Sequence, residues 1–196
     1  MSKGTISLIV VGVVVVLLIG GLLTTYNGLV QKDEAVATAW SNVQSQYQRR
    51  ADLIPNLVNT VKGYAQHESA TLEQVVAARA KATQLTVSAD ELSPEKMKQL
   101  QAAQGELSQA LGRLLMITEN YPDLKANENF LDLQAQLEGT ENRINESRRL
   151  YNESVQTYNV GIRRFPANVV AGMFGFDKRT PFEAEAGAEK APKVEF

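Results

Sequence analysis

The sequence has no cysteine and a single histidine, His67, among its 196 residues. Without cysteine there is no disulfide, thiolate metal site or cysteine nucleophile, and one histidine excludes any site within a single chain that needs two imidazoles. An excess of positive charge is also missing, because 20 Lys and Arg residues are balanced by 22 Asp and Glu residues. Nucleic-acid-binding proteins usually carry a basic face, so this balance argues against nucleic acid as a partner.

A long hydrophobic run lies near the N-terminus. Residues 6–23, ISLIVVGVVVVLLIGGLL, contain no charged side chain. As a helix they would extend roughly 27 Å, close to the roughly 30 Å of a bilayer's hydrocarbon core. A cleavable signal peptide would be followed by a small-x-small site, which the next residues, TTYNGLV, do not offer. The sequence therefore predicts a retained transmembrane anchor over residues 1–25 that contacts the lipid bilayer through residues 6–23.

The charges that flank this run give its expected orientation. Lys3 and the terminal amine precede the run, and Lys32 is the only basic residue in the next twenty or so. The positive-inside rule then favours a cytoplasmic N-terminus and a single-pass protein whose remaining residues lie on the periplasmic or other extracytoplasmic side.

Beyond the anchor, apolar residues recur at spacings of three and four, which is typical of long helices packed side by side. The four sets are Leu29, Val36, Trp40, Val43 and Tyr47; then Leu53, Leu57, Val61, Tyr64, Leu72 and Val75; then Met97, Leu100, Leu107, Leu111, Leu114 and Tyr121; and finally Phe130, Leu133, Leu137, Ile144, Tyr151, Tyr158, Ile162 and Phe165. No segment alternates with period two. We therefore predict an all-α fold in which residues 26–165 form an antiparallel four-helix bundle, with Trp40 and Leu111 in its core.

Proline and capping residues predict where the helices break. We expect the first break at residues 52–55, because proline is tolerated only in the opening turn of a helix. The second is expected at residues 86–94, with Ser93 as N-cap and Pro94 as the first helical residue. Residues 121–123 mark the third, and the last helix should cover about residues 127–164. Only Asn27 and Gly28 interrupt the path from the anchor, so the first bundle helix can continue directly from the membrane.

Several polar residues are candidate sites. The pair His67 and Glu68 resembles metal chemistry weakly, but adjacent helical residues diverge by about 100° and cannot easily chelate one ion. A structural role is favoured, with Glu68 paired to an arginine. The arginine pairs 49–50, 148–149 and 163–164 could bind phosphates or lipid headgroups. We favour instead that one arginine of each pair forms an interhelix salt bridge while the other is solvated.

Other polar residues lie on or near the helix contacts. Amides are expected to hydrogen-bond neighbouring helices at Asn56, Asn142, Asn152 and Asn159. Polar residues also interrupt the apolar stripes at Gln104, Thr118, Thr140, Ser147 and Ser154, where they either bond back to their own helix or fix the helix register. No nucleophile stands beside a base, so the sequence predicts no catalytic residue, cofactor, metal or small-molecule substrate.

The C-terminal region, residues 166–196, has two parts. Residues 165–176 are apolar, contain glycine and are too short to span a bilayer. They can pack on the bundle, bind a partner or lie on the membrane surface. The remaining residues are rich in Ala, Glu and Pro, which favours disorder.

Short segments throughout the chain resemble the LemA family of bacterial membrane proteins. The matching segments are YNGLV at 26–30, AWSNV at 39–43, RADLIPNLV at 50–58, VKGYA at 61–65, HE at 67–68, YPDLK at 121–125, Arg148 with YN at 151–152, FP at 165–166 and FGF at 174–176. The resemblance implies an N-terminal anchor in the bacterial inner membrane, an antiparallel four-helix bundle and no established enzymatic activity. Relatives in this family include magnetosome membrane proteins.

Together these observations predict a non-enzymatic, membrane-anchored scaffold. The three glycines of the hydrophobic run and the apolar tail favour a homo-oligomer that depends on both anchor and tail. The alternative is an adaptor for a membrane protein partner, such as a membrane protease or an envelope stress-response complex.

Overall fold

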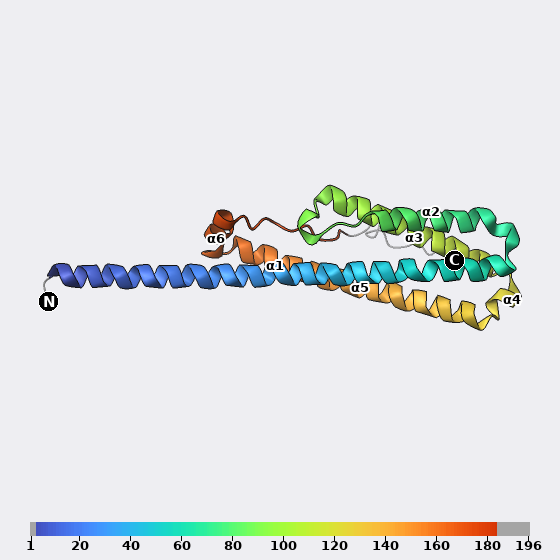
Figure 1. The fold of residues 1–196 in the computed structure, drawn as a ribbon, viewed down its shortest axis with the longest axis horizontal. Coiled ribbons are helices and arrows are strands. Elements are labelled where there is room, and N and C mark those ends of the chain that lie inside the picture. Colours follow the sequence, from blue (N-terminus) through green and yellow to red (C-terminus); the bar gives the residue numbers. More distant parts are fainter. Residues whose placement is uncertain (1–2, 184–196) are drawn as a thin grey trace, which may run out of the picture.

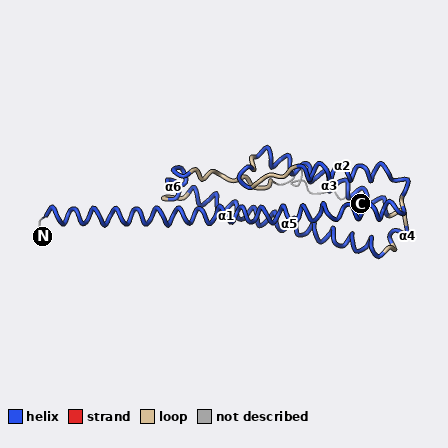
Figure 2. The backbone as a smooth tube through the Cα atoms, in the orientation of Figure 1, coloured by secondary structure: helices blue, strands red, loops and turns tan. Residues whose placement is uncertain are grey.

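A computed structural model describes residues 3–183 of the chain. Its elements in order are α1 (Lys3–Tyr64), η1 (Gln66–Glu68), α2 (Ser69–Gln84), η2 (Ala89–Glu91), α3 (Pro94–Thr118), α4 (Pro122–Lys125), α5 (Glu128–Arg163) and α6 (Ala167–Phe174). No strand occurs within residues 3–183, which confirms the all-α prediction. One long helix projects from a bundle formed by its own C-terminal half with α2, α3 and α5 (Figures 1 and 2).

Helix α1 joins the hydrophobic run to the bundle without interruption over 62 residues. Its most apolar 18-residue window has a mean hydropathy of 3.1, and none of that window is buried within the protein. It is long and apolar enough to cross a membrane once. At the end of the run the hydroxyls of Thr24 and Thr25 donate to the carbonyls of Gly20 and Gly21, so these polar groups continue the helix instead of ending it. The expected continuity of anchor and bundle is confirmed.

The predicted break at residues 52–55 is wrong, because α1 runs through Pro55 to Tyr64. Proline cannot donate to the carbonyl four residues earlier, which here belongs to Ala51. The guanidinium Nε of Arg79, on α2, donates to that carbonyl at 2.7 Å. A neighbouring helix thus replaces the hydrogen bond that the proline removes, and the helix continues.

The first reversal of the chain occurs after Tyr64. Ala65 is 1% exposed and leaves the helical conformation (φ −118°, ψ 60°), and η1 then leads into α2. The stripe predicted as a single second helix is therefore divided: Leu53 to Tyr64 belong to α1, whereas Leu72 and Val75 belong to α2.

The other predicted helix starts are confirmed. Ser93 Oγ accepts from the backbone N–H of Lys96 at 3.2 Å, and α3 begins at Pro94. Asn127 Oδ1 accepts from the N–H of Phe130 at 3.0 Å, and α5 follows directly. Both are side-chain N-caps that satisfy a donor of the first helical turn.

Two apolar clusters form the core, and α1 and α5 run antiparallel through both. The membrane-proximal cluster contains Trp40 (2% exposed), with Leu29, Val43, Leu100 and Tyr158 among its other members. The distal cluster contains Leu111 (6% exposed), with Ile54, Leu57, Leu114 and Phe130 among its other members. The prediction that Trp40 and Leu111 are core residues is confirmed.

Three hydroxyls on the apolar stripes bond back to their own helices. Thr118 donates to Leu115 O at 2.6 Å, Thr140 to Gln136 O at 2.7 Å and Ser154 to Leu150 O at 3.0 Å. These bonds satisfy polar groups locally and leave the helix contacts apolar. Gln104 differs, because it bonds a different helix, as described below.

Candidate functional site

The most distinctive site of the described chain holds an extended segment, residues 177–183, which we call the strap. The side-chain amide of Asn159 donates to Arg179 O at 2.9 Å and accepts from Arg179 N at 2.9 Å. Asn152 does the same for Phe182, at 3.1 and 2.8 Å. Residues seven apart lie on the same face of a helix, so α5 presents two amides that each bind the backbone N–H and C=O of one strap residue.

A hydrophobic pocket holds the Phe182 side chain, which is 6% exposed. Its ring centroid lies 5.4 Å from that of Tyr151 and 5.9 Å from that of Trp40, and the Arg148 guanidinium lies 4.6 Å from it. Trp40 Nε1 donates in turn to Val87 O at 2.8 Å. The pocket therefore combines aromatic faces with a cation on the remaining side.

The Tyr151 hydroxyl ties the pocket to the strap backbone by donating to Thr180 O at 2.9 Å. Burial raises the pKa of Tyr151 to about 12, although the nearby charge of Arg179 works to lower it. The hydroxyl accordingly remains neutral, and able to donate, throughout the physiological pH range.

Arg179 of the strap binds two carboxylates from different elements. Its Nη2 lies 2.8 Å from Asp33 Oδ1 on α1 and 2.6 Å from Asp90 Oδ1 on η2, and its Nε donates to Asp33 at 3.0 Å. Partial burial works to lower the pKa of Arg179, but the hydrogen bonds and charges of Asp33 and Asp90 raise it overall. The arginine is therefore a permanent cation that links α1, η2 and the strap.

This arrangement can bind a peptide but shows no chemistry for converting one. Backbone amides are recognised at two positions three residues apart, an arginine meets two carboxylates, and an aromatic ring fills a pocket.

Sequence reasoning missed the site. Asn152 and Asn159 were expected to bond neighbouring helices but bond the strap, and residues 177–183 were expected to be disordered but are held by these contacts. The rest of that prediction, for residues 184–196, lies outside the described residues.

Removing the two asparagines should release the strap. Each substitution to alanine deletes two hydrogen bonds, and a typical net contribution is about 1 kcal/mol per bond. We expect N152A/N159A to make the strap cleavable by trypsin at Lys178 and Arg179 and to lower the thermal midpoint of the bundle, because Phe182 belongs to its core. Mass spectrometry of the first cleavage products measures this. The matched control is Asn142→Ala, an exposed amide on the same helix; unchanged protection in the double variant would contradict the strap contacts.

A second polar cluster surrounds Arg50 on α1, which is 1% exposed. Its Nη1 donates to Ser108 Oγ at 2.9 Å on α3 and to Glu141 Oε1 at 2.5 Å on α5, and its Nη2 bonds Gln104 Oε1 on α3. The predicted interhelix salt bridge of this arginine pair is confirmed, with Arg49 exposed at its side. The cluster joins three helices at the boundary between the two core clusters.

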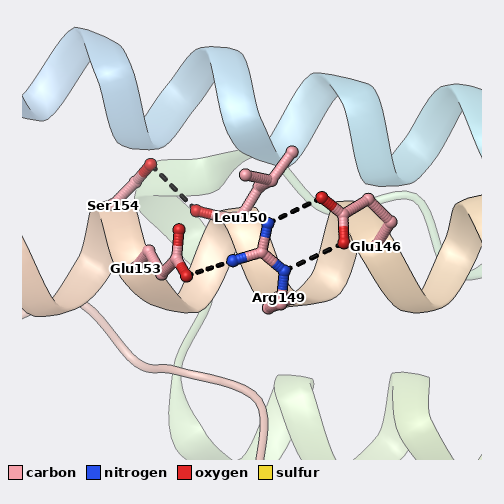
Figure 3. Close-up of polar contacts among 5 residues, drawn as sticks. All are labelled: Glu146, Arg149, Leu150, Glu153 and Ser154. Carbon is pink, nitrogen blue, oxygen red and sulfur yellow. Dashed lines mark hydrogen bonds and ion pairs between the residues drawn. The ribbon is translucent and has the colours of Figure 1, made fainter.

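The second arginine pair differs from its prediction. Arg149 bonds Glu146 and Glu153 of its own helix, so its ion pairs are intrahelical rather than interhelical (Figure 3). Glu146 and Glu153 lie three and four residues from Arg149, and this spacing brings their side chains together on one exposed face of the helix. Arg148 packs on Phe182 as described above. In the third pair, Arg163 and Arg164 are both exposed at the end of α5.

The His67–Glu68 pair lies at the reversal between α1 and α2, with His67 exposed in η1. Glu68 accepts from the Tyr121 hydroxyl at 3.1 Å, so its predicted pairing with an arginine is wrong. Among residues 3–183, no three His, Cys, Asp or Glu side chains lie close enough together to hold a metal ion.

Comparisons with known proteins place the chain in a family. The family model described as the LemA family matches residues 39–196. Magnetosome protein MamQ 2 of Paramagnetospirillum magneticum is 29% identical over 201 residues, which cover 92% of this chain and 72% of that protein. Magnetosome protein MamQ of Magnetospirillum gryphiswaldense is 29% identical over 194 residues, covering 88% and 70%. Protein LemA of Metamycoplasma hominis is 28% identical over 145 residues, covering 74% and 63%. None of these names denotes an enzyme, which fits a membrane-associated, non-enzymatic protein, and the extent of the family match shows that the chain belongs to the LemA family.

Proposed function

We propose that this protein is a non-enzymatic, membrane-anchored scaffold that assembles with copies of itself. The observation that carries the proposal is the unbroken helix α1, which is shared by the hydrophobic run and the bundle. A rigid connection holds every copy at the same angle to the membrane, and a repeated angle favours closed rings or radial arrays. The similarity to magnetosome proteins supports a role at a membrane.

Two regions supply contacts for assembly. Gly12, Gly20 and Gly21 lie on open faces of α1, since nothing beyond their chain neighbours and the adjacent backbone of the same helix comes within 4 Å of a Cβ added at any of them. Small residues permit close helix approach in lipid. The strap supplies the second contact. It follows Gly175, whose left-handed conformation (φ 74°) ends α6 and turns the chain back toward the bundle. A strap from a second copy would find the same asparagines and the same pocket, as in domain swapping.

We expect the full-length protein in mild detergent to have a mass of several chains by mass photometry, because anchor and strap both contribute contacts. A chain ending at Phe176 and a Gly20→Leu/Gly21→Leu variant should each shift the distribution toward single chains. Leu131→Ser is the matched control, because Leu131 is exposed on α5 beside Phe130 and Leu133 of the distal cluster. A single-chain mass across a concentration series would contradict the scaffold and favour an adaptor.

Mixed single-cysteine copies separate exchanged straps from straps bound within one chain. Gln101 Nε2 lies 3.0 Å from Glu183 O, so these two positions are neighbours across the site. The chain has no native cysteine. We expect a short bis-maleimide to link a Gln101→Cys copy to a Glu183→Cys copy only when straps are exchanged. If only a double variant becomes linked, and within one chain, the strap does not exchange and assembly depends on the anchor.

One observation also favours the adaptor function: the bundle binds an extended peptide, its own strap, through backbone hydrogen bonds and two side-chain sites. A membrane protease or stress-response partner with a similar segment would compete for this surface. If the partner binds through Asn152 and Asn159, it should be recovered in a pull-down with the wild-type protein. It should be lost with the N152A/N159A variant.

We further propose that the bundle lies outside the cytoplasm, anchored in the inner membrane of a bacterial cell, on the charges of Lys3 and Lys32. Ser88 is exposed in the connection before η2. Because there is no native cysteine, Ser88→Cys in intact cells should react with a membrane-impermeant maleimide without background. Labelling that requires cell lysis would reverse the orientation.

A further inference from the structure

Large apolar side chains are exposed together on α6 and the turn before it. The fractions exposed are 84% for Phe165, 52% for Val169, 66% for Met173 and 51% for Phe174. We call these four residues the α6 patch. Val169 and Met173 are about one helical turn apart and share a face, whereas Ala171, on the opposite side, and Val170, beside that face, are buried in the membrane-proximal cluster. An apolar cluster of this kind marks a surface that contacts something other than water.

The position of the patch along α1 identifies what it contacts. Leu22 and Tyr26 pack against the cluster that contains Val170, and the Tyr26 ring centroid lies 4.9 Å from that of Phe174. Leu22 belongs to the uncharged run, residues 6–23, which spans roughly 27 Å of a hydrocarbon core of about 30 Å. The edge of that core therefore falls beside Leu22 to Tyr26. In Figure 1, α6 lies at the end of the bundle that faces the projecting part of α1.

The polar neighbours of the patch suit the same location. Arg163 and Arg164 are exposed directly before it, at the end of α5. Guanidinium groups bind phosphate oxygens, and basic residues beside a membrane are attracted to anionic headgroups. Tyr26 stands where α1 leaves the hydrophobic run, the depth at which tyrosine is enriched in membrane proteins.

We infer that the α6 patch is seated in the interface of the phospholipid bilayer that α1 crosses, as a second attachment of the bundle to the membrane. In this arrangement α5 leads the chain to the membrane surface, α6 lies in that surface, and the strap leads the chain back to the bundle. Helices that lie in an interface bury their apolar face about 5–10 Å into the boundary between headgroups and acyl chains. The inference rests on the membrane anchor of the proposed function but not on self-assembly.

A second copy is the other occupant to consider, and the geometry favours lipid. Stable protein interfaces bury about 800 Å² on each partner, more than four side chains on and beside an eight-residue helix provide. A patch at the level of Leu22 to Tyr26 also meets the lipid around its own anchor before it meets another subunit.

Depth-dependent quenching tests the inference in the full-length protein. Single cysteines at Met173, at Val15 in the anchor and at Met116 near the far end of α3 would carry an NBD fluorophore. The protein would be reconstituted in phosphatidylcholine–phosphatidylglycerol vesicles with nitroxide lipids labelled near the headgroup or deep in the acyl chain. We expect the Met173 label to be quenched several-fold more by shallow than by deep nitroxides, the Val15 label to show the reverse, and the Met116 label to respond to neither.

The three labels distinguish the possible failures. If Val15 is quenched but Met173 behaves like Met116, the α6 inference falls while the anchor stands. If Val15 is not quenched, the anchor fails, and both proposals fail with it. Shielding of Met173 from nitroxide lipids and from aqueous iodide would assign the patch to a second copy and overturn the inference. Val169→Asp should abolish shallow quenching of the Met173 label, whereas Leu131→Asp, an exposed leucine at the distal end of α5, should leave it unchanged.

Discussion

Replacing Trp40 with alanine should lower the free energy of unfolding by about 3–5 kcal/mol, the usual cost of removing a large aromatic side chain from a packed core. Trp40 is 2% exposed and packs against the rings of both Tyr151 and Phe182. Its Nε1 donates to Val87 O at 2.8 Å, which fixes the connection between α2 and η2. The substitution would therefore open a cavity, leave a buried carbonyl with one donor fewer and loosen the strap pocket.

The measurement is a thermal and urea melt of the fragment that begins at Tyr26, followed by circular dichroism. Trp40→Phe is an informative second variant, because it keeps an aromatic face but removes the hydrogen bond to Val87. It should lose less stability than Trp40→Ala. Leu131→Ala, an exposed apolar residue on α5, should change the free energy by no more than about 0.5 kcal/mol. An unchanged midpoint for Trp40→Ala would contradict the assignment of Trp40 to the core.

Apolar periodicity was sufficient to predict the class of fold and most core positions, although Tyr64 and Phe165 of the predicted stripes are exposed. Trp40 and Leu111 could be placed because spacings of three and four bring such residues to one face. Ser93 could be placed as an N-cap because such a cap bonds only to residues nearby in sequence. The break at Pro55 was predicted wrongly because the contact that allows the helix to continue is distant in sequence. The compensating donor, Arg79, lies 24 positions later in the chain, and nothing local to Pro55 indicates that its guanidinium reaches Ala51 O.

The strap was missed because its binding depends on polar contacts without a period. Composition indicated disorder for residues 177–183, since one apolar residue, Phe182, stands among charged and polar ones. Asn152 and Asn159 bind the backbone of this segment. Because backbone groups are the same in nearly every residue type, such binding requires no particular side chains in the bound segment. A seven-residue spacing of asparagines on one helix face is the available signal, and it identifies a binding surface without identifying what is bound.

Arg50 should account for the second large effect on stability. Arg50→Ala would remove a buried stem and leave Gln104, Ser108 and Glu141 without their shared donor. Breaking a buried ion pair costs about 3–5 kcal/mol, and because the Glu141 side chain is 39% exposed and can be hydrated, we expect a value of about 3 kcal/mol. Glu141→Ala should cost at least as much, since the guanidinium that it leaves behind is 2% exposed and cannot reach water.

Comparing the stability losses of Arg50→Ala and Glu141→Ala shows whether Arg50 acts mainly through its charge pair or mainly through packing. If Arg50 acted mainly by filling space, Arg50→Met would restore most of the stability, because a methionine replaces the aliphatic stem. Glu141→Ala would then have little effect. If the charge pair dominates, Glu141→Ala is the most destabilising single change, and Arg50→Met combined with Glu141→Leu recovers stability relative to it, because no buried charge remains. Urea melts of the four variants decide between these outcomes. Arg149→Ala, which breaks exposed ion pairs within α5, is the control and should leave the midpoint close to that of wild type.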